Sequence, residues 1–386
     1  MITRSGWARA CAVPVAALLL AACTGEPGVR DVTVSVTSTD DACAVSRSST
    51  PAGNVVFSLK NDGSQATGFR VYEQDGTAVV AAVENVGPGA SSDLVVNLTA
   101  GDYVTACDPG MDGDEIRREL TATEAGAAAT PTGEHAEALH TASADYLAYV
   151  RAEIDTLMHK TEAFAEALAS GDDETAKAMY ADSRVHWLRI EPIAAHFGDL
   201  VPLLDLREAD LGPNEQWLGW HHAEKLLWPP AEGYTVDQAT RAELADRLVS
   251  DTANLQSRVS AGDFTVEAFQ IGNGAKELLD DVAATKITGD EEIWSGTDLW
   301  DIQASIDGAR RAFESLKPVV IDRDPKLVAE LDERFAAAQS VLSAHGSIAE
   351  GFTLYPDLTS EQVLELSRTI EALSEPLSRL TAAAVL

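Results

Sequence analysis

Val32-Thr-Val-Ser-Val-Thr37 places a valine at every second position, and this alternation decides the architecture of the first third of the chain. A period of two sends the valines to one face of a strand and the hydroxyl residues to the other. Segments 54–60 and 92–98 repeat the signal, and clusters of Gly, Pro, Asn and Asp stand between the segments. Short strands separated by turns over residues 31–123 predict an all-β sandwich.

The rest of the chain has a helical period. Residues 124–133 are small and have no periodic apolar face, so we expect a linker there. From residue 134 to residue 386, apolar residues such as Tyr146, Val150 and Ile154 recur at three- and four-residue steps. Further periodic segments, separated mostly by Gly or Pro, cover residues 173–196, 214–228, 236–260, 263–286, 297–317, 325–346 and 360–384, with Pro318 among the expected breaks. About eight helices predict an all-α domain of one or two bundles.

Residues 1–22 have the features of a lipoprotein signal peptide. Two arginines precede an apolar run over residues 10–22 that is too short to span a bilayer. The run ends in Leu20-Ala-Ala-Cys23, a lipobox whose small residues let a signal peptidase reach the bond before a lipid-modified cysteine. An ordinary signal peptide with a chance cysteine is the alternative. We expect a lipid on Cys23, a tether over residues 23–30, and a protein anchored on the periplasmic or cell-surface side of the cell membrane.

The charge of the chain excludes one class of partner. Its 62 Asp and Glu against 28 Lys and Arg give a formal net charge of −34. Such a chain repels nucleic-acid phosphates and anionic lipid headgroups, and it concentrates cations around itself. Solubility of a secreted protein would also explain the acidity.

Two cysteines lie in the β region, where they could form a disulfide or bind a metal ion. In an oxidising compartment Cys43 and Cys107 are expected to form a disulfide. The alternative is a metal site with Met111, which follows Cys107 at the spacing of a copper loop. Further candidate ligands of that site are Asp41, Glu73, Glu84 and Asp114. A type 1 copper site needs two histidines, and residues 31–123 contain none, so blue-copper electron transfer is excluded.

The helical half contains the candidate metal-binding residues. In Gly219-Trp-His221-His-Ala-Glu224, His221 and Glu224 are three residues apart and share one helix face, with Cβ atoms about 5–6 Å apart. An imidazole nitrogen and a carboxylate oxygen can then converge on one metal ion. The motif alone is weak, because chance or a surface hydrogen bond also produces it. His222 points about 100° away, so we expect it to be a supporting or surface residue.

Three acidic residues are candidate partners of this pair. Glu191 stands among large apolar residues, where a free carboxylate is unfavourable unless it is paired or metal-bound. Asp298 and Asp301 begin another predicted helix, and we expect one of the two, with a slight preference for Asp298, to be the fourth ligand. Ser295 with Asp298 also resembles a capping box, and Asp301 could instead pair with an arginine of its own helix. One histidine with carboxylates suits iron, manganese or zinc better than copper(I).

Several motifs together resemble the imelysin, or peptidase M75, family. Its hallmark G-x-H-x-x-E is met by Gly219, His221 and Glu224, and further similar segments are Glu191-Pro, 197–200, 286–289 and 297–308. The N-terminal region resembles the cupredoxin-like domain that precedes M75 in EfeO proteins, with similar segments at 40–43, 84–89 and 107–111. The resemblance implies a cupredoxin-like sandwich followed by an imelysin-like helical bundle.

The resemblance also implies a function. An EfeO protein would be the extracytoplasmic component of the EfeUOB iron-uptake system. It would bind iron, as Fe2+ or Fe3+, and pass it to the EfeU permease, with the EfeB haem peroxidase as companion. Despite the M75 name, it implies no secure peptidase activity.

Two other functions compete with iron binding. A metallopeptidase would use H-x-x-E as its metal centre, yet the zincin motif H-E-x-x-H is absent from the sequence. No G-x-S-x-G elbow, P-loop or dinucleotide fingerprint is present either. A purely structural lipoprotein would leave Glu191, His221 and Glu224 without a ligand.

The lipobox generates the first prediction. Cys23→Ser removes the sulfur that would carry the lipid, so the protein should move from the membrane fraction into the medium or remain as an uncleaved precursor. Fractionation followed by intact-mass measurement checks this. Normal processing with continued membrane attachment would show that the lipobox assignment is wrong.

Overall fold

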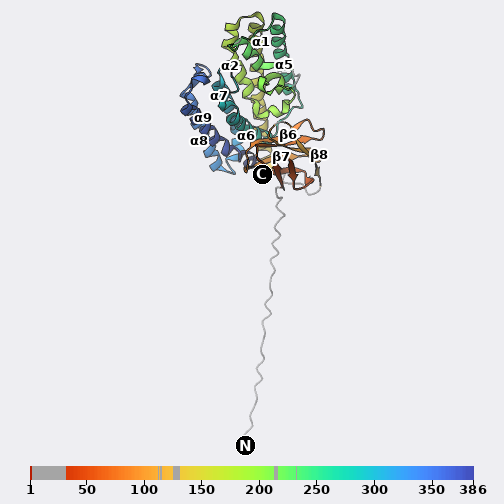
Figure 1. The fold of residues 1–386 in the computed structure, drawn as a ribbon. Helices are drawn as coiled ribbons and strands as arrows, with labels where there is room; N and C mark the ends of the chain where they lie inside the picture. The colour runs from red at the N-terminus through yellow and green to blue at the C-terminus, as the bar shows by residue number, and fades with distance from the viewer. Residues whose placement is uncertain (2–31, 112, 114, 125–130, 213–215, 232) are drawn as a thin grey trace.

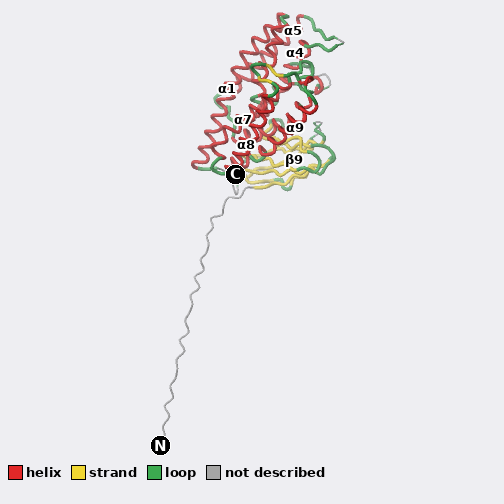
Figure 2. Tube along the Cα trace, turned by 90° about the vertical axis from the view of Figure 1, so that its left-hand side faces the viewer, coloured by secondary structure: helices red, strands yellow, loops and turns green. Residues whose placement is uncertain are grey.

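The structure is a computed structural model of the whole chain. It describes residue 1 and residues 32–111, 113, 115–124, 131–212, 216–231 and 233–386. The signal peptide, Cys23 and the tether expected from the sequence lie outside the described residues, as does Asp114. Strands gather at one end of the folded body and helices at the other (Figures 1 and 2).

The N-terminal domain is a sandwich of two sheets. One sheet has the strand order β2-β1-β4-β7 and the other has the order β3-β9-β8-β5-β6. The strands are β1 (Val32–Thr39), β2 (Ala42–Val45), β3 (Ser49–Pro51), β4 (Gly53–Asn61), β5 (Thr67–Glu73), β6 (Val79–Val86), β7 (Ser91–Leu98), β8 (Gly101–Pro109) and β9 (Ile116–Thr123). Strands β1 and β4 run parallel with Val34 opposite Phe57, whereas β4 and β7 run antiparallel.

The alternation in β1 gives this domain its core. Val34 and Val36 are fully buried, and the hydroxyl residues between them lie on the other face. Phe57 of one sheet contacts Phe69 of the other, with ring centroids 5.3 Å apart. Burying two aromatic side chains in this way removes a large apolar area from water. The predicted β-sandwich is therefore confirmed.

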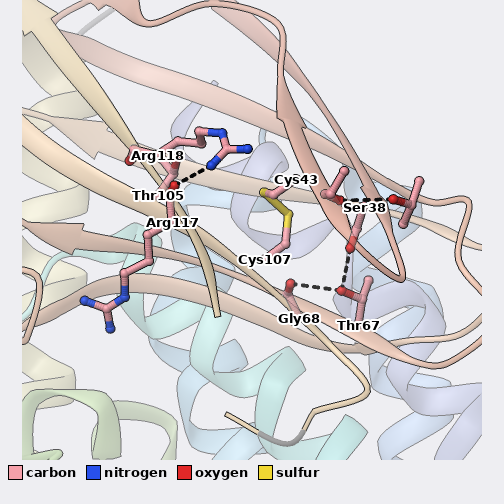
Figure 3. Close-up of a disulfide and its surroundings, with 10 residues drawn as sticks. Ser38, Cys43, Thr67, Gly68, Thr105, Cys107, Arg117 and Arg118 are labelled. Atoms are coloured by element: carbon pink, nitrogen blue, oxygen red, sulfur yellow. Dashed lines mark hydrogen bonds between the residues drawn. A yellow bond between two sulfur atoms is a disulfide. The ribbon is translucent and has the colours of Figure 1, made fainter. Parts of the chain in front are cut away.

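A disulfide joins the two sheets. Cys43 in β2 and Cys107 in β8 are bonded, and both side chains are buried (Figure 3). Their sulfur atoms are engaged with each other and are not free to serve as soft metal ligands. Of the two fates that the sequence leaves open, the structure shows the disulfide.

The C-terminal domain is mostly helical. Its α-helices are α1 (Gly133–Ser170), α2 (Asp173–Leu188), α3 (Val201–Asp205), α4 (Gly219–Leu227), α5 (Gln238–Ser260), α6 (Ala268–Ala284), α7 (Asp298–Val320), α8 (Pro325–Ser343), α9 (Ser360–Leu377) and α10 (Leu380–Val385). Short 3-10 helices are η1 (Glu191–Phe197), η2 (Glu208–Asp210), η3 (Lys286–Thr288) and η4 (Tyr355–Asp357), and β10 (Gly346–Ser347) pairs with β11 (Gly351–Phe352).

The predicted stripe of α1 is its buried face. Tyr146, Val150 and Ile154 are fully buried where α1 packs against α2, α5 and α7. The helix α1 thus runs along one edge of the domain, at the left in Figure 2, and shorter helices lie beside it. Among the described residues, no helix is both long and apolar enough to cross a membrane.

Two expectations about this domain need correction. Pro318 does not end its helix, because α7 continues to Val320. Proline removes one N–H group, whose partner would be the carbonyl of Glu314 four residues earlier. Both Glu314 and Pro318 lie on the exposed face, where water can satisfy that carbonyl, while Val319 and Val320 anchor the last turn in the core. The domain also contains the short β10–β11 hairpin, where the periodicity of the sequence predicts only helices.

The two domains contact each other through α6 and the C-terminus. Asn273 of α6 donates from Nδ2 to the carbonyl of Val95 in β7 (2.7 Å). Asn54 of β4 donates to the carbonyl of Val385 (2.8 Å). Figure 1 shows α6 and the C-terminus beside β6 and β7. The sandwich therefore supports the same helix, α6, that leads toward the polar centre of the helical domain.

The disulfide generates the second prediction. It closes a segment of 64 residues, so removing it should destabilise the β domain by about 4 kcal/mol through the entropy of the unfolded chain. Urea unfolding of the Cys43→Ala/Cys107→Ala variant, followed by far-UV circular dichroism, checks this. Non-reduced peptide mapping of the wild type is the control. Two alkylatable thiols in protein taken from the cell surface would contradict the disulfide and favour metal ligation.

Candidate metal centre

The helix α4 brings His221 and Glu224 into the interior. Gly219 begins this helix at φ +81°, and a Cβ there would lie 2.2 Å from the carbonyl oxygen of Leu204. Only glycine tolerates both the backbone conformation and this approach. The close contact sets the start of α4 against the end of α3, which carries Asp205. His221 and Glu224 are both 0% exposed.

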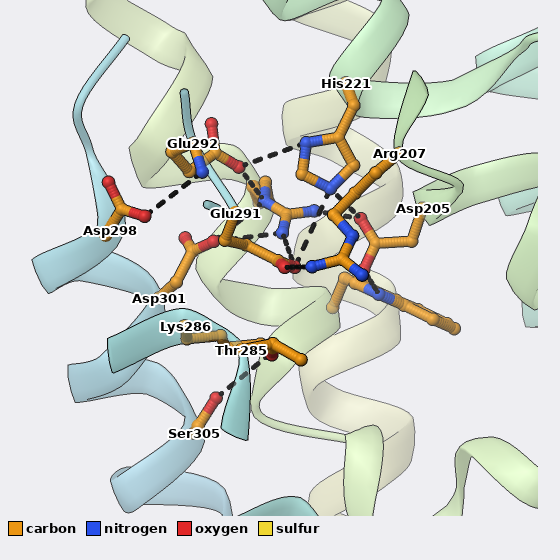
Figure 4. Close-up of polar contacts among 12 residues, drawn as sticks. Asp205, Arg207, His221, Thr285, Lys286, Glu291, Glu292, Asp298, Asp301 and Ser305 are labelled. Carbon is orange, nitrogen blue, oxygen red and sulfur yellow. Dashed lines mark hydrogen bonds and ion pairs between the residues drawn. The ribbon is translucent and has the colours of Figure 1, made fainter. Parts of the chain in front are cut away.

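Two further elements supply carboxylates to the same place. The segment between η3 and α7 contributes Glu291 and Glu292, and the first turn of α7 contributes Asp298 and Asp301. All four are buried (Figure 4). Carboxylates in the first turn of a helix are stabilised by the partial positive charge of its N-terminus.

Arg184 of α2 stands at the centre of this cluster. Its guanidinium is fully buried and contacts Glu292 at 2.7 Å, Asp301 at 2.9 Å and Glu291 at 3.1 Å. It also pairs with Asp205. Burial alone would lower the pKa of Arg184, but the charges of these carboxylates raise it well above its usual value. One guanidinium therefore neutralises only part of a strongly anionic cluster.

His221 lies between two pairs of carboxylates. Its Nδ1 is 3.6 Å from Glu292 Oε1 and 3.7 Å from Glu224 Oε2. Its Nε2 is 3.5 Å from Asp205 Oδ1 and 3.7 Å from Glu291 Oε1. Among the described residues, neither ring nitrogen has a hydrogen-bond partner at normal distance. Buried polar atoms are normally satisfied, so two such nitrogens on one ring, each facing two carboxylates, favour a site that binds a cation.

Three buried carboxylate oxygens in and beside this cluster are also without a hydrogen bond among the described residues. They are Oε2 of Glu224, Oδ2 of Asp298 and Oδ1 of Asp301. Burial raises the pKa of Asp298 to about 7 and raises that of Asp301 as well. Leaving such oxygens buried and unpaired is unfavourable, and a cation would remove the penalty.

The cluster is also set up to hold a proton. Burial and the charge of Arg184 both disfavour a charged imidazole, yet Glu224 and Glu291 outweigh them and raise the pKa of His221 to about 10. Burial, together with the charge of Glu224, raises the pKa of Glu292 well above its usual range. The carboxylates thus attract positive charge strongly enough to keep a proton on the histidine.

The structure brings together most, but not all, of the residues expected from the sequence. His221 and Glu224 converge with Glu292 as candidate ligands. Asp298 and Asp301 are buried beside this group, where Asp298 accepts from the N–H of Glu292 and Asp301 pairs with Arg184, and neither joins the converging ligand atoms. Glu191 lies elsewhere: its Oε2 accepts a hydrogen bond from Nζ of buried Lys286 (2.8 Å). Burial raises the pKa of Glu191 to about 8, against the opposing charge of Lys286.

Two alternative roles for the aspartates are not seen. Asp298 does not form a capping box with Ser295, because its Oδ1 accepts from the backbone N–H of Glu292 (3.1 Å). Asp301 does not pair with an arginine of its own helix, because Arg184 of α2 takes that place. His222 stacks on Trp217, with ring centroids 4.7 Å apart, and faces away from the cluster.

Four residues of the cluster were not predicted from the sequence: Asp205, Glu291, Glu292 and Arg184. Glu291 and Glu292 lie in an irregular segment, where no periodicity assigns a face. The available signal was the run of three acidic residues, Asp290-Glu291-Glu292, between Gly289 and Gly296 and just before Asp298. Asp205 ends the apolar run Val201-Pro-Leu-Leu204, which was an equally local clue.

The β domain offers no comparable centre. Arg70 forms ion pairs with Glu84, with Asp108 (3.1 Å) and with Glu115 (2.8 Å), so an internal cation already neutralises this acidic group. Met111 lies in the turn after β8, while Asp41 and Glu73 are exposed. Within the described part of the β domain, no three histidine, cysteine or carboxylate ligand atoms converge as they do around His221.

Comparison with known proteins agrees with both domains. Residues 142–380 match the Imelysin family (Peptidase_M75), and residues 11–122 match the cupredoxin-like domain family. The chain is 34% identical over 350 residues to "Iron uptake system component EfeO" of Escherichia coli (strain K12), covering 90% of both chains. It is 33% identical over 352 residues to the protein of that name from Yersinia pestis, again over 90% of both. Since the matches span both domains in the same order, the chain belongs to the EfeO family, with a cupredoxin-like domain followed by an imelysin (M75) domain.

Proposed function

We propose that this protein is the iron-binding component of an EfeUOB-type iron uptake system outside the cytoplasmic membrane. It captures iron at the buried cluster around His221 and passes it to an EfeU-type permease, with an EfeB-type haem peroxidase as companion. The observation that carries the proposal is the pair of unsatisfied nitrogens of His221, each facing two carboxylates. A lipid on Cys23 would keep the protein close to that permease.

The carboxylates that face the two ring nitrogens of His221 differ in how many positively charged or N–H partners they already have. On the Nε2 side, Asp205 contacts Arg184 and Trp187 Nε1, and Glu291 contacts Arg184 and Arg207. These carboxylates can accept a hydrogen bond from the N–H at Nε2, which orients the ring and strengthens Nδ1 as a ligand.

On the Nδ1 side, Glu224 Oε2 has no partner among the described residues. Its other oxygen accepts from the backbone N–H groups of Trp294 (3.0 Å) and Ser295 (2.7 Å), and this fixes the free oxygen toward the ring. A cation about 2.0–2.2 Å from each ligand bridges atoms up to roughly 4 Å apart, so Nδ1, Glu224 and Glu292 can bind it with little movement. We infer that iron binds on this side.

The donor set is compatible with iron and disfavours copper(I), and the names of the relatives point to iron among the metals that fit. Imidazole with carboxylates suits Fe2+ or Fe3+, and it also suits zinc, whereas copper(I) prefers sulfur. Since Cys43 and Cys107 are bonded to each other, the β domain gives copper no thiolate. The relatives are named for iron uptake, which favours iron as the cargo.

We infer that the protein is a binding protein and not a peptidase. A zincin places two histidines and a glutamate base on one helix, with an open position for water. Here α4 contributes a single inward histidine, and the cluster is closed by buried side chains. Casein digestion that stops with a chelator would contradict this inference.

The third prediction tests the centre. His221→Ala removes the only imidazole in the described cluster and should weaken iron binding at least about tenfold, or roughly 1.4 kcal/mol. Isothermal titration under anaerobic conditions with Fe2+ checks this. His222→Ala is the matched control, since the neighbouring ring faces away, and it should change the affinity much less.

A second comparison tests Glu224 against Glu191, two of the carboxylates that the sequence predicts as ligands. Glu224→Gln should weaken iron binding about as much as His221→Ala, because it removes the unpaired oxygen. Glu191→Gln should have a smaller effect, because Glu191 pairs with Lys286. Wild-type binding by His221→Ala, or silent titration of the wild type, would favour the structural lipoprotein instead.

The fourth prediction concerns pH. In the metal-free protein His221 carries a proton up to about pH 10, whereas a ligand imidazole must be free at the metal-binding nitrogen. At pH 7 each bound iron therefore releases a proton, and the affinity should rise with pH by about tenfold per unit for each proton released. Because the pKa of Asp298 is about 7, the dependence should be steeper below pH 7 than above it. Titrations at several pH values, in buffers of different ionisation enthalpy, measure both quantities.

A further inference from the structure

The segment 289–296, here called the ligand loop, is tied to the metal centre by side chains and by backbone. It contributes Glu291 and Glu292. Its N–H groups at Trp294 and Ser295 donate to Glu224, and the N–H of Glu292 donates to Asp298. Any movement of this loop therefore changes several candidate ligands at once.

A turn from a distant part of the chain packs against both ends of the ligand loop. The loop begins at Gly289 (φ +76°) and ends at Gly296 (φ +68°). A Cβ on Gly289 would lie 2.4 Å from the ring of Tyr355, and a Cβ on Gly296 would lie 2.8 Å from Pro356 Cδ. The backbone N–H of Tyr355 donates to the carbonyl of Gly296 (2.8 Å). Its hydroxyl donates to the carbonyl of Ile287.

The metal centre is closed in this conformation. His221, Glu224, Glu292, Asp298 and Asp301 are all 0% exposed, so a cation cannot reach them unless some part of the wall moves. The other walls belong to α2, α3, α4 and α7. The loop is the irregular wall, and such segments open more readily than packed helices.

The packing around Tyr355 leaves room for movement. A surface groove of about 590 Å³ lies beside the ring and is lined by Ile287, Thr288, Pro356, Leu358, Val363 and Leu364, among others. The ring therefore faces open space on one side. Contact with both ends of the loop and free space beside it are the features of a clamp that can open.

We propose that Tyr355 is a positioning residue that holds the ligand loop closed and thereby sets the rates at which the cation enters and leaves the centre. Tyr355 is not itself a ligand. The inference rests on the proposed function, because it takes the cluster around His221 to be the iron site. It adds the element that controls exchange.

The fifth prediction separates a clamp from a merely structural residue. In Tyr355→Ala, entry and exit rates should both rise about tenfold, while the dissociation constant changes less than about threefold, because opening becomes easier without loss of a ligand. Stopped-flow mixing with Fe2+ gives the entry rate, and mixing the loaded protein with a chromogenic chelator gives the exit rate. Tyr355→Phe keeps the ring and loses one hydrogen bond, so both rates should rise less.

Ile293→Ala is the matched control. This side chain lies on the same loop but is 54% exposed, and its truncation should leave both rates unchanged. Unchanged rates in both Tyr355 variants would overturn the proposal. So would a faster exit alone with a matching loss of affinity, which would mean damage to the ligands.

Hydrogen exchange of the metal-free proteins gives a readout that does not need iron. In Tyr355→Ala the amides of Trp294 and Ser295 should exchange faster, while those of α1 and α7 keep their protection. Uniformly faster exchange would mean general destabilisation and would overturn the clamp. If the wild type bound no iron, the proposed function would fail, whereas the exchange experiment would still test whether Tyr355 holds the loop.

Discussion

The ion pairs of the buried Arg184 guanidinium are the interactions on which the rest of the helical domain depends. Four carboxylates from α3, the ligand loop and α7 converge on it, and none of them could be buried there alone. Arg184 therefore fixes where these separate elements meet. It satisfies only part of the negative charge, because Glu224, Asp298 and Asp301 each keep an unpaired oxygen. The cluster is stable enough to fold and remains anionic enough to attract a cation.

The sequence predicted the parts of this architecture that depend on local periodicity. Alternation in Val32–Thr37 identified the sandwich, and the three-residue spacing of His221 and Glu224 correctly placed both on one buried face. Asp298 and Asp301 were expected at the start of a helix with a clear apolar pattern, and both lie in the first turn of α7, while their role as metal ligands stays a prediction. In each case the spacing along the chain determines the direction of the side chain.

The parts that were missed depend on tertiary contacts. Glu291, Glu292 and Asp205 lie where the backbone has no repeating geometry, so nothing in the sequence assigns them a direction. Glu191 has the apolar sequence neighbours expected of a buried ligand. In the folded chain, however, Lys286, which is 95 residues away in sequence, lies next to it and donates a hydrogen bond to it. Pro318 was predicted to break α7, yet an exposed face lets water replace the lost hydrogen bond. At Pro318 the tendency of proline to end a helix was outweighed by solvent exposure and core contacts that exist only in the folded chain.

Arg184 also explains how such a centre could exchange its cargo without collapsing. If Glu292 turns from Arg184 toward a cation, the guanidinium keeps Asp205, Glu291 and Asp301, so no buried charge is left unpaired. When the cation leaves, a proton on His221 takes over part of its charge. The empty and loaded states then differ by the exchange of the cation for a proton, which replaces part of its charge, within the same set of side chains. A site of this kind needs no large rearrangement to bind or release its ligand, and control of exchange can reside in the loop that covers it.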